Sequence, residues 1–317
     1  MLIVYCKAAS IVFQSSALLI LFGYLGAPFA MNQSGVIQNL QQVSLSGIGE
    51  SRCVKSELTH FEKTEVHSPI SIKMVTEGVE HYELNGSHYQ LKKGHFLLVN
   101  EGEAIATNVH TSQPTKGICI YPPLQLIQQA FTYFSTSGND PEKIVAATSQ
   151  THFTSGTFRL QADNGLSQFL HRSACQLTTD YTKDEEWWMQ FYLQLSTQMA
   201  TEQKAIENKL KQLQSAKRQT REELYRRVIK ARDFIHDNQF NTLDINAITE
   251  ISALSKYHFL RSFKAVFNQS PYQYALQLKL SAAQQLIQGG YSYQQAAFQV
   301  GYSDGQNLRK ALRRFSE

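Results

Sequence analysis

Two groups of side chains in the C-terminal third of the chain have the chemistry to contact DNA. The first group lies between residues 255 and 267, and the second follows residue 304. Arginine can donate two parallel hydrogen bonds to guanine, asparagine and glutamine can pair with adenine, and lysine neutralises phosphate. We therefore expect both groups to face double-stranded DNA; they comprise Lys256, Tyr257, Leu260, Arg261 and Lys264, then Gln306, Asn307, Lys310 and Arg313.

The charge of the 317-residue chain is distributed unevenly, which fits this expectation. The whole sequence carries a formal charge of +4. Residues 217–317 hold 15 Lys and Arg against 8 Asp and Glu, or +7, and the remainder is at −3. A basic C-terminal third favours a polyanionic partner, although a solvated basic surface would look the same.

The first group is carried by a pattern of two short helices. Asp244 is suited to cap a helix that ends near Ile251, and Ser255 is suited to cap the next one after a tight turn. Phe259 and Phe263 stand four residues apart on the second helix, so they share its buried face. Two helices joined by a tight turn predict a helix-turn-helix.

The pattern recurs closer to the C-terminus. Capping boxes are expected at Thr220–Glu223, which would open a helix to about Asp237, at Ser270–Gln273 with Pro271 in the first turn, and at Ser292–Gln295. Gly301 suits a left-handed turn, and the last helix would begin near Asp304. Its inward residues are expected to be Leu308, Leu312 and Phe315.

A helix of about 18 residues, from Pro271 to Gln288, would join the two units. Its length is roughly 27 Å at the usual helical rise. Successive major grooves on one side of a duplex lie roughly 34 Å apart. This spacer could therefore place two recognition helices in adjacent grooves.

Residues 220–316 resemble the AraC/XylS family of bacterial transcription regulators. The strings that carry the resemblance are LSKYHFLRSFKAVFNQSPYQY and YSYQQAAFQVGYSDGQNLRKALRRF. The resemblance puts base-facing positions at Tyr257, Leu260 and Arg261, then at Gln306, Asn307 and Lys310. The chain departs from the family pattern at Leu260, which cannot hydrogen-bond a base, and at Lys279, Gly305, Leu308 and Leu312.

The N-terminal half reads as short strands followed by helices. Asn85–Gly86 separates two alternating segments, which predicts a hairpin, and Gly117–Tyr121 is a further strand. This region resembles, more weakly, the cupin-type sensor barrel of the same family, which implies a small-molecule effector. Helices are expected over residues 126–214, where the stripe from Trp187 to Met199 fits either packing on the barrel or a dimer interface.

A metal enzyme of the cupin type is the first alternative. Such enzymes bind a metal through a His-x-His pair, but the matching segment here is His81-Tyr82-Glu83. His88, His95 and His110 are the remaining candidates, and lone strand histidines are more often structural. We therefore expect no metal, no cofactor and no catalytic residues. No nucleophile elbow, phosphate loop or dinucleotide fingerprint appears.

Residues 1–30 are apolar and resemble a secretory signal or membrane anchor. Export would separate a DNA-binding domain from DNA, so the favoured hypothesis is that translation starts at Met31 and the protein is cytoplasmic. A membrane-tethered regulator is the second alternative. A third is an adaptor whose helix-turn-helix units bind protein.

Together these patterns predict an α+β protein of several domains, none of them an enzyme. An antiparallel barrel with helices would span residues 45–214, and an all-α DNA-binding domain residues 220–317. The expected partners are double-stranded DNA, RNA polymerase, a small-molecule effector and a second copy of the chain. The sequence leaves open whether the protein is an activator or a repressor.

Overall fold

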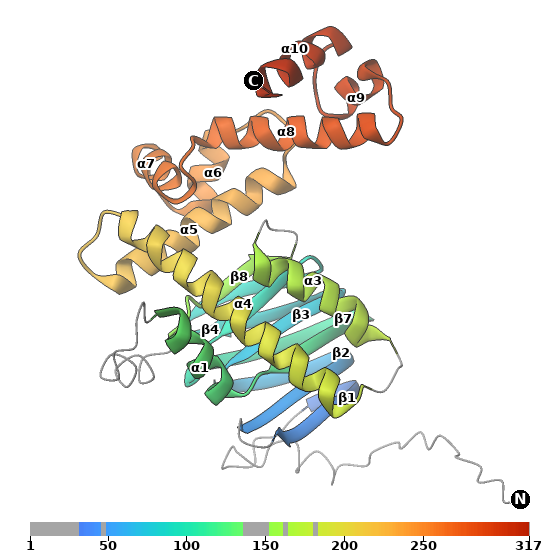
Figure 1. The fold of residues 1–317 in the computed structure, drawn as a ribbon, viewed down its shortest axis with the longest axis vertical. Coiled ribbons are helices and arrows are strands. Elements are labelled where there is room, and N and C mark those ends of the chain that lie inside the picture. Colours follow the sequence, from blue (N-terminus) through green and yellow to red (C-terminus); the bar gives the residue numbers. More distant parts are fainter. Residues whose placement is uncertain (1–31, 46–48, 136–151, 161–163, 180–182, 317) are drawn as a thin grey trace, which may run out of the picture.

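The computed structural model describes residues 32–45, 49–135, 152–160, 164–179 and 183–316. The hypotheses on residues 1–30 and Met31 lie outside these ranges. An antiparallel sheet covered by helices forms the N-terminal part, and six helices extend from it toward the C-terminus (Figure 1). The α+β order expected from the sequence is confirmed. No helix in the described ranges combines the length and the apolar character needed to cross a membrane.

Eight described strands form the sheet. Its main order is β1-β2-β7-β3-β6-β8, and β4 pairs with both β5 and β7. The strands are β1 (Asn32–Leu45), β2 (Gly49–Ser68), β3 (Ser71–Glu77), β4 (Val79–Leu84), β5 (Ser87–Lys92), β6 (His95–Val99), β7 (Glu103–Tyr121) and β8 (Gly156–Arg159). The β4–β5 turn is the expected hairpin, with positive φ at Asn85 and Gly86.

The long strands β2 and β7 belong to two halves of the sheet. The C-terminal part of β7 pairs with β3, and its N-terminal part pairs with β4. β2 runs along β7 through both parts. The sequence predicted only the last five residues of β7, and it placed β8 in a helical region. Both expectations are corrected here, because strand pairing over such distances leaves no local signal.

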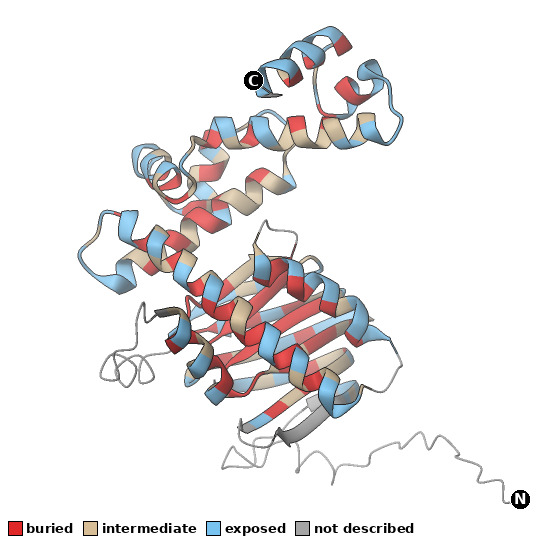
Figure 2. Ribbon diagram, in the orientation of Figure 1, coloured by how far each residue is buried: buried red, intermediate tan, exposed pale blue. Residues whose placement is uncertain are grey.

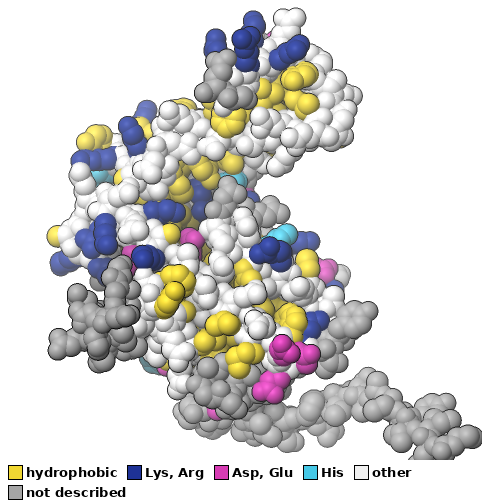
Figure 3. Space-filling view, in the orientation of Figure 1, with side chains coloured by type: hydrophobic (Ala, Val, Ile, Leu, Met, Phe, Trp, Pro, Cys, Tyr) yellow, Lys and Arg dark blue, Asp and Glu magenta, His cyan; other side chains and the backbone are white. Residues whose placement is uncertain are grey.

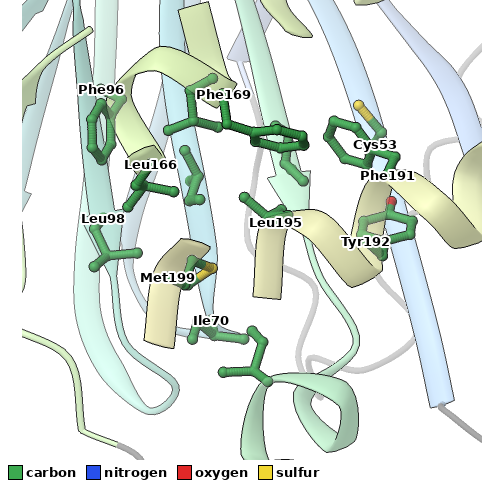
Figure 4. Close-up of a cluster of buried hydrophobic side chains, with 14 of the residues drawn as sticks. Cys53, Ile70, Phe96, Leu98, Leu166, Phe169, Phe191, Tyr192, Leu195 and Met199 are labelled. Carbon is green, nitrogen blue, oxygen red and sulfur yellow. The ribbon is translucent and has the colours of Figure 1, made fainter. Parts of the chain in front are cut away.

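Three helices cover one face of the sheet: α1 (Leu124–Ser135), α3 (Gly165–Thr178) and α4 (Glu185–Gln212) (Figure 1). Side chains of α3 and α4 pack with those of the strands in the core between the layers (Figure 4). Trp188, Phe191, Leu195 and Met199 are all buried in this core. The apolar stripe of α4 therefore packs on the sheet of its own chain.

The C-terminal helices form two smaller cores (Figure 2). They are α5 (Arg218–Asp237), α6 (Ile245–Ser252), α7 (Lys256–Phe267), α8 (Pro271–Gln288), α9 (Tyr293–Gln299) and α10 (Gly305–Ser316). The capping boxes at Ser270 and Ser292 are present as expected, with Pro271 in the first turn of α8. Because capping boxes are local signals, the sequence alone predicted where α8 and α9 begin.

Two expectations for the C-terminal region are wrong. Thr220 does not cap α5, which begins two residues earlier after Lys217 and has no side-chain cap. Glu223 instead accepts hydrogen bonds from Arg226 and Arg227, so it does not reach back to the helix start. Phe315, expected inside, is 41% exposed.

Candidate nucleic-acid interface

The first helix-turn-helix consists of α6 and α7. The Asp244 carboxylate accepts from the backbone N–H groups of Asn246 and Ala247, which starts α6. Ala253 ends α6 in a left-handed conformation with φ +50°. Ser255 then caps α7, whose Phe259 and Phe263 are fully buried. The turn and both caps hold α7 with one face inward and the other toward solvent.

The outer face of α7 carries most of the residues expected to contact DNA. Lys256, Tyr257, Arg261 and Lys264 are exposed, and the Tyr257 side chain is 67% exposed. The Arg261 guanidinium donates to the Tyr257 hydroxyl at 3.4 Å. Leu260 is half-buried against the core of this unit. Its role is therefore at least partly packing, consistent with a side chain that cannot hydrogen-bond.

The second helix-turn-helix consists of α9 and α10, and two glycines allow its close packing. Gly301 has φ +78°, and a Cβ there would lie 2.7 Å from the Phe240 carbonyl oxygen. A Cβ on Gly305 would lie 2.9 Å from the backbone nitrogen of Gln294. Gly305 is thus required where α10 approaches α9, which gives a physical reason for a residue of low helix propensity at this position.

The outer face of α10 presents the second expected group. Gln306, Asn307, Lys310 and Arg313 are all exposed. The Asn307 amide donates to the Asp304 carboxylate at 2.7 Å and to the Ser303 hydroxyl at 3.2 Å. To pair with a base, Asn307 would have to give up these bonds at the start of α10.

The residues predicted from the sequence to contact DNA did not include two further cations on α10. Arg309 and Arg314 are exposed on α10, and the Arg309 guanidinium lies 5.5 Å from the ring centre of Tyr293 on α9. In Figure 3 Lys and Arg side chains gather near the C-terminal end and again on the part that holds α7. The helix periodicity alone could have identified Arg309 and Arg314 as exposed.

A chain of hydrogen bonds connects the N-terminal part to the turn of the first unit. Arg226 on α5 donates to the Ser155 carbonyl at 2.9 Å and to Glu223 at 3.0 Å. Arg227 donates to the same Glu223 at 2.9 Å and to the Ala253 carbonyl at 3.1 Å. Glu223 therefore links a contact with the sheet region to the residue that ends α6.

Further ion pairs hold α5 against the N-terminal part. Asp237 accepts from Arg159 at 2.8 Å and from Lys92 at 3.2 Å. Glu222 is buried, and Arg218 donates to it at 2.8 Å while His152 lies 3.4 Å away. Burial alone would raise the pKa of Glu222, but the bonds from His152 and Arg218 outweigh it and lower the pKa to about 2.

An open recess of about 730 Å³ lies beside this junction. Arg218, Glu222 and Arg226 of α5 form one wall, and Asn85 and Glu103 of the sheet lie in another. Glu103 accepts from the backbone N–H of Asn100 at 2.7 Å and from the Ser155 hydroxyl at 2.6 Å. The recess shows that α5 meets the sheet through polar side chains with space between them.

Two family models match the chain. An AraC-like ligand binding domain matches residues 55–177, and a helix-turn-helix domain matches residues 248–317. The chain belongs to the AraC family. The ligand-binding match runs from within β2 to α3, and the helix-turn-helix match runs from within α6 through α10.

A curated relative matches part of this AraC-family chain. It is YbfI, an uncharacterized HTH-type transcriptional regulator of Bacillus subtilis (strain 168), 30% identical over 76 residues. The match covers 24% of this chain and 28% of the length of YbfI. The chain thus matches less than a third of that relative.

Several solved structures are similar in part. ToxT from Vibrio cholerae O395 is 8% identical, covering 80% of this chain and 87% of ToxT, with a TM-score of 0.28. Unsaturated fatty acid bound wild-type ToxT from Vibrio cholerae strain SCE256 is 7% identical, covering 90% and 93%, with a TM-score of 0.32. A Cupin_2 domain of an XRE family regulator from Enterobacter cloacae is 15% identical, covering 28% and 95%, with a TM-score of 0.24.

The histidines of the AraC-family sheet do not form a metal site in the part that the structure describes. His81, His88 and His110 are exposed, whereas His95 is buried. His110 lies beside His60, with 3.3 Å between their Nδ1 atoms. No group of three or more His, Cys, Asp or Glu side chains suited to a metal occurs among the described residues. The AraC family assignment favours a regulator over an enzyme.

Proposed function

We propose that this protein is a transcription regulator that binds a specific double-stranded DNA sequence through α7 and α10 and responds to a small-molecule effector in its N-terminal domain. The observation that carries the proposal is the pair of helix-turn-helix units on one helix, α8. Each unit presents an exposed face with Lys or Arg side chains. Two recognition helices on a common spacer suit adjacent major grooves of one duplex.

The exposed side chains would divide into two roles. Arg261 on α7 and Gln306 on α10 would read bases, because arginine suits guanine and glutamine suits adenine. Lys256, Lys264, Lys310 and Arg313 would contact phosphates and fix the register. Tyr257 would support Arg261, and Asn307 would contribute after leaving Asp304. Arg309 and Arg314 would add to the phosphate contacts of α10.

The effector would act by shifting the population of two arrangements of α5 and the first unit. A ligand can do this only if it binds one arrangement better than the other. The bonds from Ser155 through Arg226, Glu223 and Arg227 to Ala253 offer a physical connection from the sheet to the turn between α6 and α7. A small movement of the sheet edge near Ser155 would therefore be transmitted through these hydrogen bonds to α7.

The domain boundaries and partners complete the proposal. The ligand-binding domain would span residues 45–214 and the DNA-binding domain residues 220–317, with α5 extending two residues further toward the N-terminus. The protein would work in the cytoplasm on RNA polymerase at its promoter, as a homodimer, without a metal or a catalytic step. Because α4 buries its apolar stripe, the dimer would use another surface.

The test is binding of the purified chain to DNA from upstream of its own gene, with competitor DNA over a salt series. Arg261→Ala should weaken specific binding by about 1–3 kcal/mol and relax the preference at one base pair. Lys264→Ala should weaken all sequences alike and reduce the salt dependence by about one counterion. Arg172→Ala, at an exposed position on α3, is the matched control.

Binding that survives competitor, falls steeply with salt and is lost in Arg261→Ala would support the proposal. Unchanged specific binding by Arg261→Ala would show that the recognition face is placed wrongly. Salt-insensitive association with a protein, with no DNA binding at any salt concentration, would favour the adaptor instead.

A further inference from the structure

One acidic residue stands alone in the basic region that carries both recognition helices. Between residues 251 and 316 the sequence has eight Lys and Arg and a single acidic residue, Asp304. Asp304 directly precedes α10, the second recognition helix, and lies three residues before Asn307. A carboxylate beside a DNA-binding face repels phosphates, so Asp304 opposes binding unless it also has a local task.

The two oxygens of the Asp304 carboxylate have different tasks. Oδ1 accepts from the backbone N–H of Asn307 at 2.8 Å and so caps α10. Oδ2 accepts from the side-chain amide of Asn307 at 2.7 Å and from the Ser303 hydroxyl at 3.1 Å. One oxygen is enough to start the helix, and the second oxygen holds side chains.

The nitrogen of the Asn307 side-chain amide is fully used by these contacts. It donates to Asp304 Oδ2 and, at 3.2 Å, to Ser303 Oγ. The hydrogen bond from the backbone N–H of Asn307 lowers the pKa of Asp304, so the carboxylate is ionised and can only accept. The amide nitrogen must therefore face Asp304, and the carbonyl oxygen is the end left for DNA.

This arrangement limits which bases Asn307 can distinguish. Adenine offers an acceptor at N7 and a donor at N6, and asparagine pairs with it through both ends of the amide. Cytosine offers a donor at N4. While Asp304 holds the amide nitrogen, the carbonyl oxygen can accept one hydrogen bond from either base. Adenine then gains no second bond, and Asn307 hardly distinguishes it from cytosine.

The base-reading side chain of α7 is held less firmly. The Arg261 guanidinium donates to the Tyr257 hydroxyl at 3.4 Å, a longer and therefore weaker bond than the one between Asn307 and Asp304. A guanidinium has five N–H donors, so one such bond leaves others for guanine. The two units therefore differ in how freely their base-reading side chains can turn to DNA.

We propose that Asp304 competes with DNA for the Asn307 side chain and so restrains base reading by the second unit. The inference rests on the proposed function, because it concerns the face of α10 that would meet DNA. Releasing Asn307 costs a hydrogen bond to an ionised acceptor, which offsets most of the gain from pairing with adenine. Asp304 is thus a positioning residue that acts through Asn307, and Asn307 adds little base preference in the wild type.

The test measures base preference with the purified full-length chain and duplexes based on its upstream DNA. Each base pair in the stretch that α10 would cover is set in turn to each of the four base pairs, and Kd is measured at constant salt. Asp304→Ser keeps a capping oxygen and removes the second one, so it should raise the preference for adenine over cytosine at one position at least about fivefold. Asn307→Ala should change this preference less than about threefold in the wild type and should abolish the gain in the Asp304→Ser background.

Asp244→Ser is the matched control. Asp244 also caps a helix with Oδ1, accepting from the backbone N–H groups of Asn246 and Ala247 in the first unit. Its replacement removes the same charge from the DNA-binding region. It should leave the preference between adenine and cytosine in the stretch covered by α10 unchanged.

A preference for adenine that appears in Asp304→Ser and disappears when Asn307→Ala is added would support the proposal. Equal tightening on all four base pairs, which loss of charge alone would cause, would overturn it, as would the same preference in the wild type and Asp304→Ser. A loss of preference above about tenfold in Asn307→Ala alone would also overturn it. This last variant keeps the cap of α10, since Asn307 is exposed and its backbone N–H remains. A wild-type chain that binds no DNA would overturn the proposed function as well, whereas each of the other results leaves that function standing.

Discussion

The two helix-turn-helix units have the same plan but different interiors. The first packs α6 and α7 on α5 with large aromatic side chains, and Phe259 and Phe263 are fully buried. The second is built around Ala283, Ala296 and Ala297, with Leu308 and Leu312 from α10. Small side chains bury less apolar area, so the second unit gains less stability from its own core.

The units also differ in what they adjoin. The first shares α5 with the ligand-binding domain, through Arg226, Glu223 and Arg227. The second packs on α8, and Gly301 in its turn approaches the Phe240 carbonyl in the loop between α5 and α6. We therefore expect an effector to act first on the first unit, and to reach the second unit through α8 and through the contact at Phe240.

Truncating each core should give the largest effects and should separate the two units. Phe263→Ala should destabilise the protein by about 3–5 kcal/mol, because it leaves a cavity among Phe259, Phe267 and Tyr274. Leu308→Ala should cost about 2–5 kcal/mol. Hydrogen exchange should show faster exchange through α5 to α8 for the first variant and mainly in α9 and α10 for the second.

Leu193→Ala, at an exposed leucine of α4, is the control and should leave exchange in both units unchanged. If Leu308→Ala accelerated exchange in α6 and α7 as strongly as in α10, the two units would be one cooperative body and the comparison would fail.

Acid should loosen the first unit from the ligand-binding domain through Glu222. Its folded pKa of about 2 is below the ordinary value of 4.5, so its contribution is complete above pH 4.5 and is lost as the pH falls toward 2. After allowance for solvent screening we expect about 1–2 kcal/mol. Urea unfolding of the wild type and of Glu222→Gln at several pH values measures this contribution to the free energy of unfolding. The unfolding free energies of the two proteins should converge as the pH falls from 4.5 toward 2. A constant difference over this pH range would contradict the role assigned to Glu222.

Removing the helix caps should give the smallest effects. Ser270→Ala and Ser292→Ala each remove a side-chain bond to the third residue of a helix, at a cost of about 1 kcal/mol. Ser292→Ala should affect DNA affinity more, because α9 has 7 residues against 18 in α8, so a lost cap removes a larger share of its helix stability. Thr220→Ala is the control, since Thr220 does not cap α5. Thermal unfolding measures the loss of stability, and DNA titration measures the loss of affinity. Equal losses of DNA affinity in Ser270→Ala and Ser292→Ala would contradict the expected difference between the two caps.

The sequence predicted the C-terminal region best because its signals are local. Ser270 and Ser292 mark helix starts within four residues, and Phe259 and Phe263 mark a buried face within one turn. The capping box predicted at Thr220 is wrong. Thr220 lies inside α5, and Glu223 accepts a hydrogen bond from Arg226 and does not bond back to the helix start. The sequence also offered no reason for Gly305, whose role depends on α9.

The sheet could be predicted only in outline. The hairpin at Asn85–Gly86 has a local turn signal, but β8 and the long β7 depend on pairing with distant strands. The hydrogen bond from Lys73 on β3 to Cys119 on β7 could not be predicted for the same reason.

Footprinting of the purified chain on its upstream DNA tests the central claim most directly. Two recognition helices on α8 predict two protected stretches of the major groove on one side of the duplex, about 10 base pairs apart. Arg261→Ala should weaken protection at one stretch, and Lys310→Ala with Arg313→Ala should weaken the other. Protection of both stretches with these separate losses is the predicted result. A single protected stretch that is unaffected by changes on α10 would contradict the claim that both units bind DNA.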